Sequence, residues 1–229
     1  MKIQIRRGVF ETNSSSVHTI SISKNTVKSA KGKSVTFCTG GTFGWGPDLV
    51  AGVSRRAQYL WQAILSSFDY RIFERNGAHY GSDAYFEKEY DIEMKQLEIV
   101  KERKSKLENL LKSEGVNFSF VESNLVSISE EEYAENRKNH KYKPAWIFTP
   151  YESDIAYELR DECGYGYIDH PCGGDIFEFL DYVLSDSKHL IEYLFGPSYV
   201  EIGNDNEEPH EEMTFNVDGI DYQIFEKGN

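Results

Sequence analysis

The segment Ser54-Arg-Arg-Ala-Gln-Tyr-Leu-Trp-Gln-Ala-Ile-Leu-Ser-Ser-Phe68 holds the clearest structural signal in this chain. Its apolar residues recur at helical intervals of three and four, so they share one face of a helix. Such a face has to be buried against another element, and the segment therefore predicts a helix packed on the core. Trp61 is expected in that core, although its basic neighbours Arg55 and Arg56 would also suit a nucleic-acid platform. The apolar face consists of Ala57, Leu60, Trp61, Ile64, Leu65 and Phe68.

The residues before this helix have the pattern of β-strands. Apolar and polar residues interleave over residues 3–5 and 17–22, and residues 35–37 are β-branched or aromatic. Residues 40–47 contain four glycines and one proline, which predict an irregular loop. We therefore expect two or three strands ahead of the first helix.

A long helix is predicted from Asp83 to Glu114, with Ser82 as its N-cap and Gly115 as its C-cap signal. Its later part has the heptad spacing of a helix that pairs along a narrow seam, with one lysine in that seam. We expect an exposed helix or helical hairpin laid against the domain, and an oligomerisation coiled coil stays open as the alternative. The seam residues are Leu97, Val100, Lys104, Leu107 and Leu111.

The rest of the chain adds strands and shorter helices without an internal repeat or a strict alternation of the two. This predicts an α+β fold, in which a mixed or antiparallel sheet is packed by several helices and one long helix or helical hairpin spans about 83–114. We expect a single globular domain over 1–229, with a helical protrusion at 83–116. The predicted strands are 117–128, 145–149, 198–202, 213–217 and 222–225, with a turn at 218–219, and the predicted helices are 130–137, 175–184 and 187–195.

Composition indicates a globular protein without a membrane span. Of the 229 residues, 39% are hydrophobic and 14% aromatic, which is enough for a sizeable core. There is no apolar run of the length that a membrane helix needs and no apolar segment behind the first charges, so we expect neither a span nor a signal peptide. The three cysteines are irregularly spaced, which argues against a secreted disulfide framework and favours a cytoplasmic protein.

Charge is distributed unevenly along the chain. Residues 1–116 carry a net charge of +5 and residues 117–229 a net charge of −18, which together give −13. Residues 1–33 contain seven basic residues and one acid, which favours an anionic ligand near the start of the chain. The acidic total disfavours general nucleic-acid binding, because neutralisation of phosphates supplies most of that affinity. A basic protein partner remains open.

The first candidate site is Arg6-Arg-Gly-Val-Phe-Glu-Thr-Asn-Ser-Ser-Ser-Val-His18. Hydroxyls, an amide and backbone N–H groups can surround a phosphate or carboxylate, and arginine adds a bidentate cation. His18 can act as a proton donor or base. The alternatives to an anion site are a polar turn whose side chains bond to their own backbone and a serine nucleophile. No nucleotide-binding fingerprint is present. The predicted ligand-binding residues here are Arg6, Arg7, Thr12, Asn13, Ser14, Ser15 and Ser16.

Two further polar stretches follow apolar segments. Asp169 and His170 lie in a glycine-rich region and form a candidate acid/base pair. A zinc set with Cys163 and Cys172 has poor spacing and lacks a fourth ligand, and a helix-capping loop is the other alternative. In the stretch that begins at Gly203, Asn204 and Asn206 are candidate ligand-binding residues and Asp205 a candidate ligand for a divalent metal such as magnesium. An ordinary turn remains open there.

Four stretches together resemble an uncharacterised family of bacterial and bacteriophage proteins. The resemblance is carried by Arg7-Gly-Val-Phe-Glu-Thr-Asn-Ser-Ser-Ser-Val-His18, Phe43-Gly-Trp45, Ile168-Asp-His170 and Gly203-Asn-Asp-Asn206. It is specific for the first stretch and looser for the others, and this chain departs from the pattern at Pro171 and Cys172. The family brings no function with it. The resemblance implies a bacterial or phage origin and a common site for the three polar stretches.

The leading functional hypothesis is a nucleotide- or phosphate-directed protein, a hydrolase or transferase acting on a nucleotide-like substrate. It requires residues 12–18, 169–170 and 204–206 to meet in one pocket. The alternative is a non-catalytic acidic binding protein, such as a phage-encoded, anti-CRISPR-like inhibitor of a host nucleic-acid-handling defence complex. The expected partner is a small anionic ligand in the first case and a basic protein in the second.

Overall fold

The computed structural model describes residues 16–40, 43–44, 48–66, 88–139, 145–149, 168, 174–204 and 219–227. Helices and strands in these ranges surround one hydrophobic core, which confirms the predicted α+β class. The strands predicted at 3–5 and 213–217 and the N-cap predicted at Ser82 lie outside the described residues. None of the helices that the structure describes is long and apolar enough to cross a membrane.

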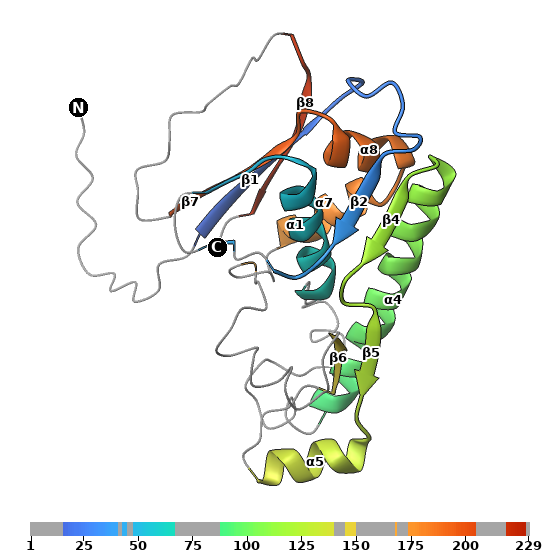
Figure 1. The fold of residues 1–229 in the computed structure, drawn as a ribbon. Coiled ribbons are helices and arrows are strands. Elements are labelled where there is room, and N and C mark those ends of the chain that lie inside the picture. Colours follow the sequence, from blue (N-terminus) through green and yellow to red (C-terminus); the bar gives the residue numbers. More distant parts are fainter. Residues whose placement is uncertain are drawn as a thin grey trace, which may run out of the picture.

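A four-stranded antiparallel sheet forms one end of the molecule (Figure 1). Its central strand β1 comes from the start of the described chain, whereas the neighbouring strands on both sides come from the C-terminal part. The edge strand β3 was not expected from the sequence, because three residues are too few for a periodic signal. In spatial order the strands are β3 (Asp48–Val50), β7 (Tyr199–Asn204), β1 (Ser16–Ser23) and β8 (Tyr222–Lys227).

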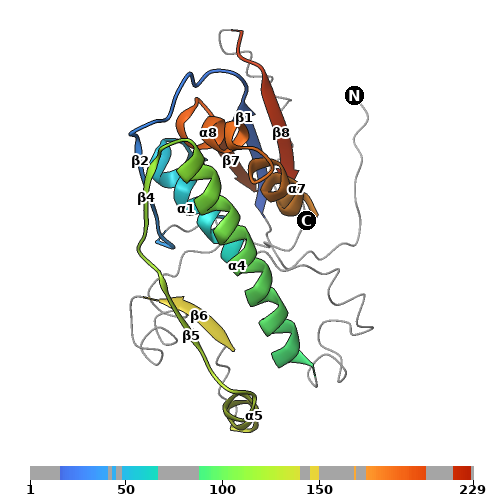
Figure 2. The ribbon, with the colours of Figure 1, turned by 90° about the vertical axis from the view of Figure 1, so that its right-hand side faces the viewer.

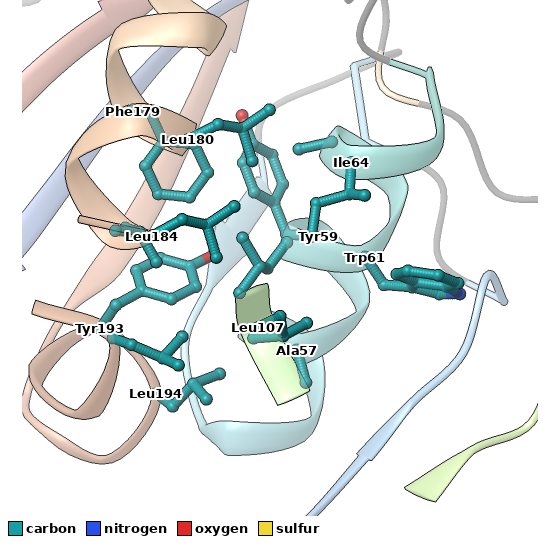
Figure 3. Close-up of a cluster of buried hydrophobic side chains, with 14 of the residues drawn as sticks. Ala57, Tyr59, Trp61, Ile64, Leu107, Phe179, Leu180, Leu184, Tyr193 and Leu194 are labelled. Carbon is teal, nitrogen blue, oxygen red and sulfur yellow. The ribbon is translucent and has the colours of Figure 1, made fainter. Parts of the chain in front are cut away.

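Three helices cover one face of this sheet, as Figures 1 and 2 show. They are α1 (Val53–Ser66), α7 (Gly174–Val183) and α8 (Ser187–Phe195), close to the ranges predicted from periodicity. The apolar side chains of β1 and β7 meet them in the core. Figure 3 shows the centre of that core, where side chains of α1, α4, α7 and α8 interdigitate. Trp61 is fully buried there against Phe120 and Phe148, so the expected core position is confirmed.

A buried carboxylate joins β1 to α8. Glu192 accepts hydrogen bonds from the hydroxyl of Ser23 at 2.9 Å and from the backbone N–H groups of Thr26 and Val27 at 2.6 and 2.8 Å. Gly196 allows this approach, since a Cβ atom there would lie 2.3 Å from Ser23 Oγ and 2.8 Å from Glu192 Oε2. The end of β1 and the end of α8 are thus packed without room for a side chain.

Helix α4 (Glu89–Ser113) runs along the side of the molecule (Figure 2). It ends at the predicted glycine: Gly115 has a φ of +66°, its N–H donates to Lys112 at 3.1 Å, and the N–H of Val116 donates to Leu111 at 3.0 Å. This pair of bonds is a Schellman motif, which satisfies carbonyls that the helix itself cannot.

The seam of α4 is buried within this chain. Leu97, Val100, Leu107 and Leu111 all belong to the core cluster. Lys104 does not interrupt the packing, because its ammonium lies 4.4 Å from the centre of the Phe120 ring and pairs with Glu108 at the surface. The seam is therefore unavailable to a second copy, which contradicts the coiled-coil alternative and agrees with a helix laid against the domain.

The strands between α4 and α7 belong to two separate pairs, one of which includes a strand from the start of the chain. β4 (Asn117–Phe120) pairs in parallel with β2 (Ser34–Phe37), and β5 (Asn124–Ser127) pairs antiparallel with β6 (Trp146–Thr149). The single strand predicted at 117–128 was wrong, because the buried Glu122 breaks it: its carboxylate accepts from the N–H and hydroxyl of Thr39 at 3.2 and 3.0 Å. The predicted acidic helix is α5 (Glu130–Lys138), at the end of the molecule opposite the sheet (Figure 1).

Candidate functional site

The opening polar run ends at the start of β1, beside the end of β7. In the antiparallel register, the Cα atoms of Ser16 and Asn204 are partners, and His18 is opposite Ile202. Ser16 closes the run of hydroxyl residues, and Asn204 opens the stretch that continues with Asp205 and Asn206. Two of the three predicted polar stretches therefore start from neighbouring backbone positions at one end of the sheet.

His18 lies beneath this end, on the helix-covered face. Its side chain is fully buried, and its Nδ1 atom lies 2.8 Å from the hydroxyl oxygen of Tyr59 in α1. Figure 3 shows Tyr59 extending from α1 towards Phe179 and Leu180 of α7. Burial raises the pKa of Tyr59 well above its ordinary range, and the nearby Tyr193 adds to this, so the phenol stays neutral. The sequence did not single out Tyr59.

Ile168, the residue before the third polar stretch, is linked to the same place through Phe43. Phe43 forms an isolated parallel bridge with Ile168, the residue that directly precedes Asp169 and His170. Both side chains are buried, and the Phe43 ring meets the Tyr59 ring edge-on with centres 5.1 Å apart. Ile168, Phe43, Tyr59 and His18 thus form a continuous chain of contacts. The Phe43-Gly-Trp45 stretch contributes to it through Phe43.

An ion pair that no sequence pattern indicated lies at the rim of this region. Arg55 lies 4.8 Å above the centre of the Phe43 ring and pairs with Asp48 of β3, and the side chains of Arg55 and Asp48 are 39% and 36% exposed. Asp48 is in register with Ile202, which is in turn opposite His18. Arg55 and Tyr59 are four residues apart and so share a face of α1, which is the one signal that could have linked them.

Four of the seven basic residues in the first 33 positions do not lie at this site. The lysines of the loop between β1 and β2 follow Ser23, at the opposite end of β1 from Ser16. An eight-residue strand separates its ends by roughly 25 Å, because each residue advances about 3.3 Å. The expectation that all seven favour an anion near the opening run was therefore wrong for Lys24, Lys28, Lys31 and Lys33.

Most of the remaining predicted site residues lie outside the described part of the chain. Ser16 and Asn204 are placed by their backbones. Among the described residues no group of three or more His, Cys, Asp or Glu side chains could hold a metal. The predicted metal ligand Asp205 lies outside the described residues. The others outside are Arg6, Arg7, Thr12, Asn13, Ser14, Ser15, Asp169, His170 and Asn206.

Comparison with known proteins adds no relative. No protein-family model, curated protein or solved structure matches this chain. The resemblance to a bacterial and phage family therefore stays a prediction.

Proposed function

We propose that this is a nucleotide- or phosphate-directed protein of bacterial or phage origin, with its ligand site where β1 begins and β7 ends. One observation carries the proposal. The pairs Ser16–Asn204 and Phe43–Ile168 belong to four stretches that are far apart in sequence, and the contacts of His18 with Tyr59 and of Tyr59 with Phe43 join the two pairs. Polar stretches whose ends meet in this way are well placed to share a ligand.

The chemistry of these stretches favours an anion. The hydroxyl and amide residues from Thr12 to Ser16 offer donors for phosphate oxygens, and Arg6 and Arg7 immediately precede them in the chain. Arg55 adds a solvent-accessible guanidinium beside Phe43, held by Asp48 but exposed enough to reach a ligand. Such a set would hold a phosphate-bearing molecule more readily than a neutral one.

Hydrolysis or group transfer is the reaction class that we assign to this site. His18 or His170 would transfer a proton, and Asp169 would orient the base. Asp205, one residue after Asn204, would hold a divalent metal if one takes part, with Asn204 and Asn206 as ligand-binding neighbours. Covalent catalysis by a serine of the opening run is not part of the proposal.

A thermal-shift screen tests the proposal. The protein is heated with nucleotides, cyclic nucleotides, NAD, inorganic phosphate and divalent metals, and the screen is repeated with Ser15→Ala and His18→Gln. Ser34→Ala, at an exposed position in β2, and His189→Ala in α8 serve as matched controls. A ligand should raise the melting temperature of the parent and of both controls but not of the two site variants. An equal shift in all five proteins would refute the proposed site.

The non-catalytic alternative is favoured by one feature of α5. Glu130, Glu131, Glu132 and Glu135 are exposed on this helix, which lies at the end of the molecule opposite the sheet (Figure 1). An acidic binding protein would use such carboxylates against a basic protein partner. Charge reversal of Glu131 and Glu135 would then abolish a salt-sensitive association that Ser15→Ala and His18→Gln leave intact. The opposite result supports the small-ligand site.

A further inference from the structure

The hydrogen bond between Tyr59 and His18 can be made in two ways. Either the Tyr59 hydroxyl donates its proton to an unprotonated Nδ1, or a protonated Nδ1 donates to the Tyr59 oxygen. The 2.8 Å separation suits both arrangements. A neutral imidazole carries one proton on one of its two ring nitrogens. In the first arrangement that proton is on Nε2, and in the second it is on Nδ1.

The surroundings of Tyr59 distinguish the two arrangements. Its side chain is fully buried, and in the described part of the chain its hydroxyl has Nδ1 of His18 as its hydrogen-bond partner, while the ring contacts the apolar rings of Phe43 and Phe179. The phenol also keeps its proton, since burial raises its pKa. If Nδ1 were protonated, the hydroxyl proton of Tyr59 would lack that acceptor, and a buried donor without an acceptor is unfavourable.

We propose that Tyr59 is a positioning residue that holds neutral His18 in the tautomer with its proton on Nε2. His18 then offers an N–H donor at Nε2 and no free lone pair there. This inference rests on the proposed function for the role of His18, and it narrows that role: neutral His18 donates a hydrogen bond from Nε2 to an oxygen of the anionic ligand, and proton transfer is left to His170. Activation of a nucleophile by Nε2 of the neutral ring is excluded by the same tautomer.

The tautomer is measured on the ligand-free, full-length protein. Two-bond proton–nitrogen correlation spectra of the ¹⁵N-labelled imidazole rings distinguish a protonated from an unprotonated ring nitrogen, and the His18 signals are assigned by their loss in His18→Gln. At a pH where His18 is neutral, Nδ1 should appear unprotonated and Nε2 protonated. A protonated Nδ1, or an equal mixture of both tautomers, would overturn the proposal even before any variant is made.

Substitution of Tyr59 then tests the cause. Tyr59→Phe removes the hydroxyl and keeps the ring, so the His18 spectrum should lose its single-tautomer pattern. Tyr193→Phe is the matched control, because Tyr193 is also fully buried in the core but its hydroxyl donates to the carbonyl of Arg56 at 3.1 Å. The control should leave the His18 spectrum unchanged. A Tyr59→Phe protein that folds and still shows the same single tautomer would show that another group sets it.

The result is independent of the ligand screen. If the spectra show the expected tautomer but no nucleotide or phosphate binds, the proposed function fails and the tautomer assignment stands. If a ligand binds through Ser15 and His18 but Nδ1 is protonated, the proposed function stands and the tautomer assignment fails.

Discussion

Glu93, in the first half of α4, is a partly buried carboxylate that joins three elements. Its Oε1 atom accepts a hydrogen bond from the hydroxyl of Tyr133 in α5 at 2.8 Å, and its Oε2 atom accepts one from the N–H of Ala145, just before β6, at 2.5 Å. Burial raises the pKa of Glu93 above its ordinary value of 4.5, and these two hydrogen bonds offset only part of that effect. The side chain of Arg137 lies 3.8 Å away.

The raised pKa predicts a pH dependence of stability. The folded protein holds the Glu93 proton more tightly than the unfolded chain does, so the stabilisation is complete below pH 4.5 and is lost as the pH rises through the folded pKa. Glu93→Gln cannot titrate. The unfolding free energy of the parent minus that of this variant should therefore fall as the pH rises from 4.5 towards neutrality. Urea unfolding across this range measures it.

Glu108 on the same helix provides the control of opposite sign. A hydrogen bond from Lys104 lowers the pKa of Glu108, so its stabilisation is present above pH 4.5 and is lost as the pH falls through the folded pKa. The parent should therefore gain stability over Glu108→Gln as the pH rises towards 4.5. Slopes of the same sign for both variants would contradict this account.

At the scale of elements, Arg56 connects α1 to the C-terminal end of α8. Its guanidinium is buried and donates hydrogen bonds to the carbonyl oxygens of Gly196 at 2.7 Å, of Leu194 at 2.9 Å and of Ser198. Carbonyls at this end of a helix have no intrahelical donor, and the negative end of the helix dipole attracts a cation. Burial lowers the pKa of Arg56, which is consistent with a structural role and not with phosphate contact at the surface.

Substitution of Arg56 should therefore weaken the contact between α1 and α8 and lower the free energy of unfolding. Arg56→Met leaves the α8 carbonyls buried without donors, and hydrogen bonds to charged groups contribute about 1.5–3 kcal/mol each. We expect a loss of about 3 kcal/mol or more in the free energy of unfolding, measured by chemical denaturation. Arg55→Met changes the adjacent arginine, whose pair with Asp48 is half-exposed, and should cost less than about 1 kcal/mol. Equal losses would mean that the carbonyl contacts of Arg56 contribute little.

At the scale of the whole molecule, burial is concentrated around the sheet and falls towards α5. Ile20 and Ile22 of β1 are fully buried, whereas Tyr133 is the buried residue of α5, and Leu125 of β5 is exposed. Regions with few buried apolar contacts open at lower free energy than the core. The far end formed by α5, β5 and β6 should therefore open without unfolding of the sheet.

Hydrogen exchange measures this difference. Backbone amides of α5 and β5 should exchange by local opening, at a lower free energy than the amides of β1, which should require global unfolding. Tyr133→Phe removes the hydroxyl that donates to Glu93 and should accelerate exchange in α5 and β6 while β1 stays unchanged. Equal protection of α5 and β1 in the parent would show that the molecule opens as one unit.

Several elements follow from local spacing, because helix periodicity and capping involve residues that are close in the chain. The helical face from Ala57 to Leu65, the helices at 175–184 and 187–195 and the C-cap glycine Gly115 could all be predicted in this way. The break at Glu122 could not, because its cause is a hydrogen bond to Thr39, a residue far away in sequence. The three-residue strand β3 has no local signal at all.

In the candidate site, too, some features follow from the sequence and others only from contacts between distant residues. By itself the sequence determined the chemical character of the polar stretches, the acidity of the second half and the types of most elements. Only the tertiary structure decided that β1 lies between C-terminal strands, that Ser16 is opposite Asn204, that His18 is buried on Tyr59, and that Arg56 binds a helix end while Arg55 stays accessible. These choices depend on contacts between distant residues, and no local pattern records which strand or helix a side chain will meet.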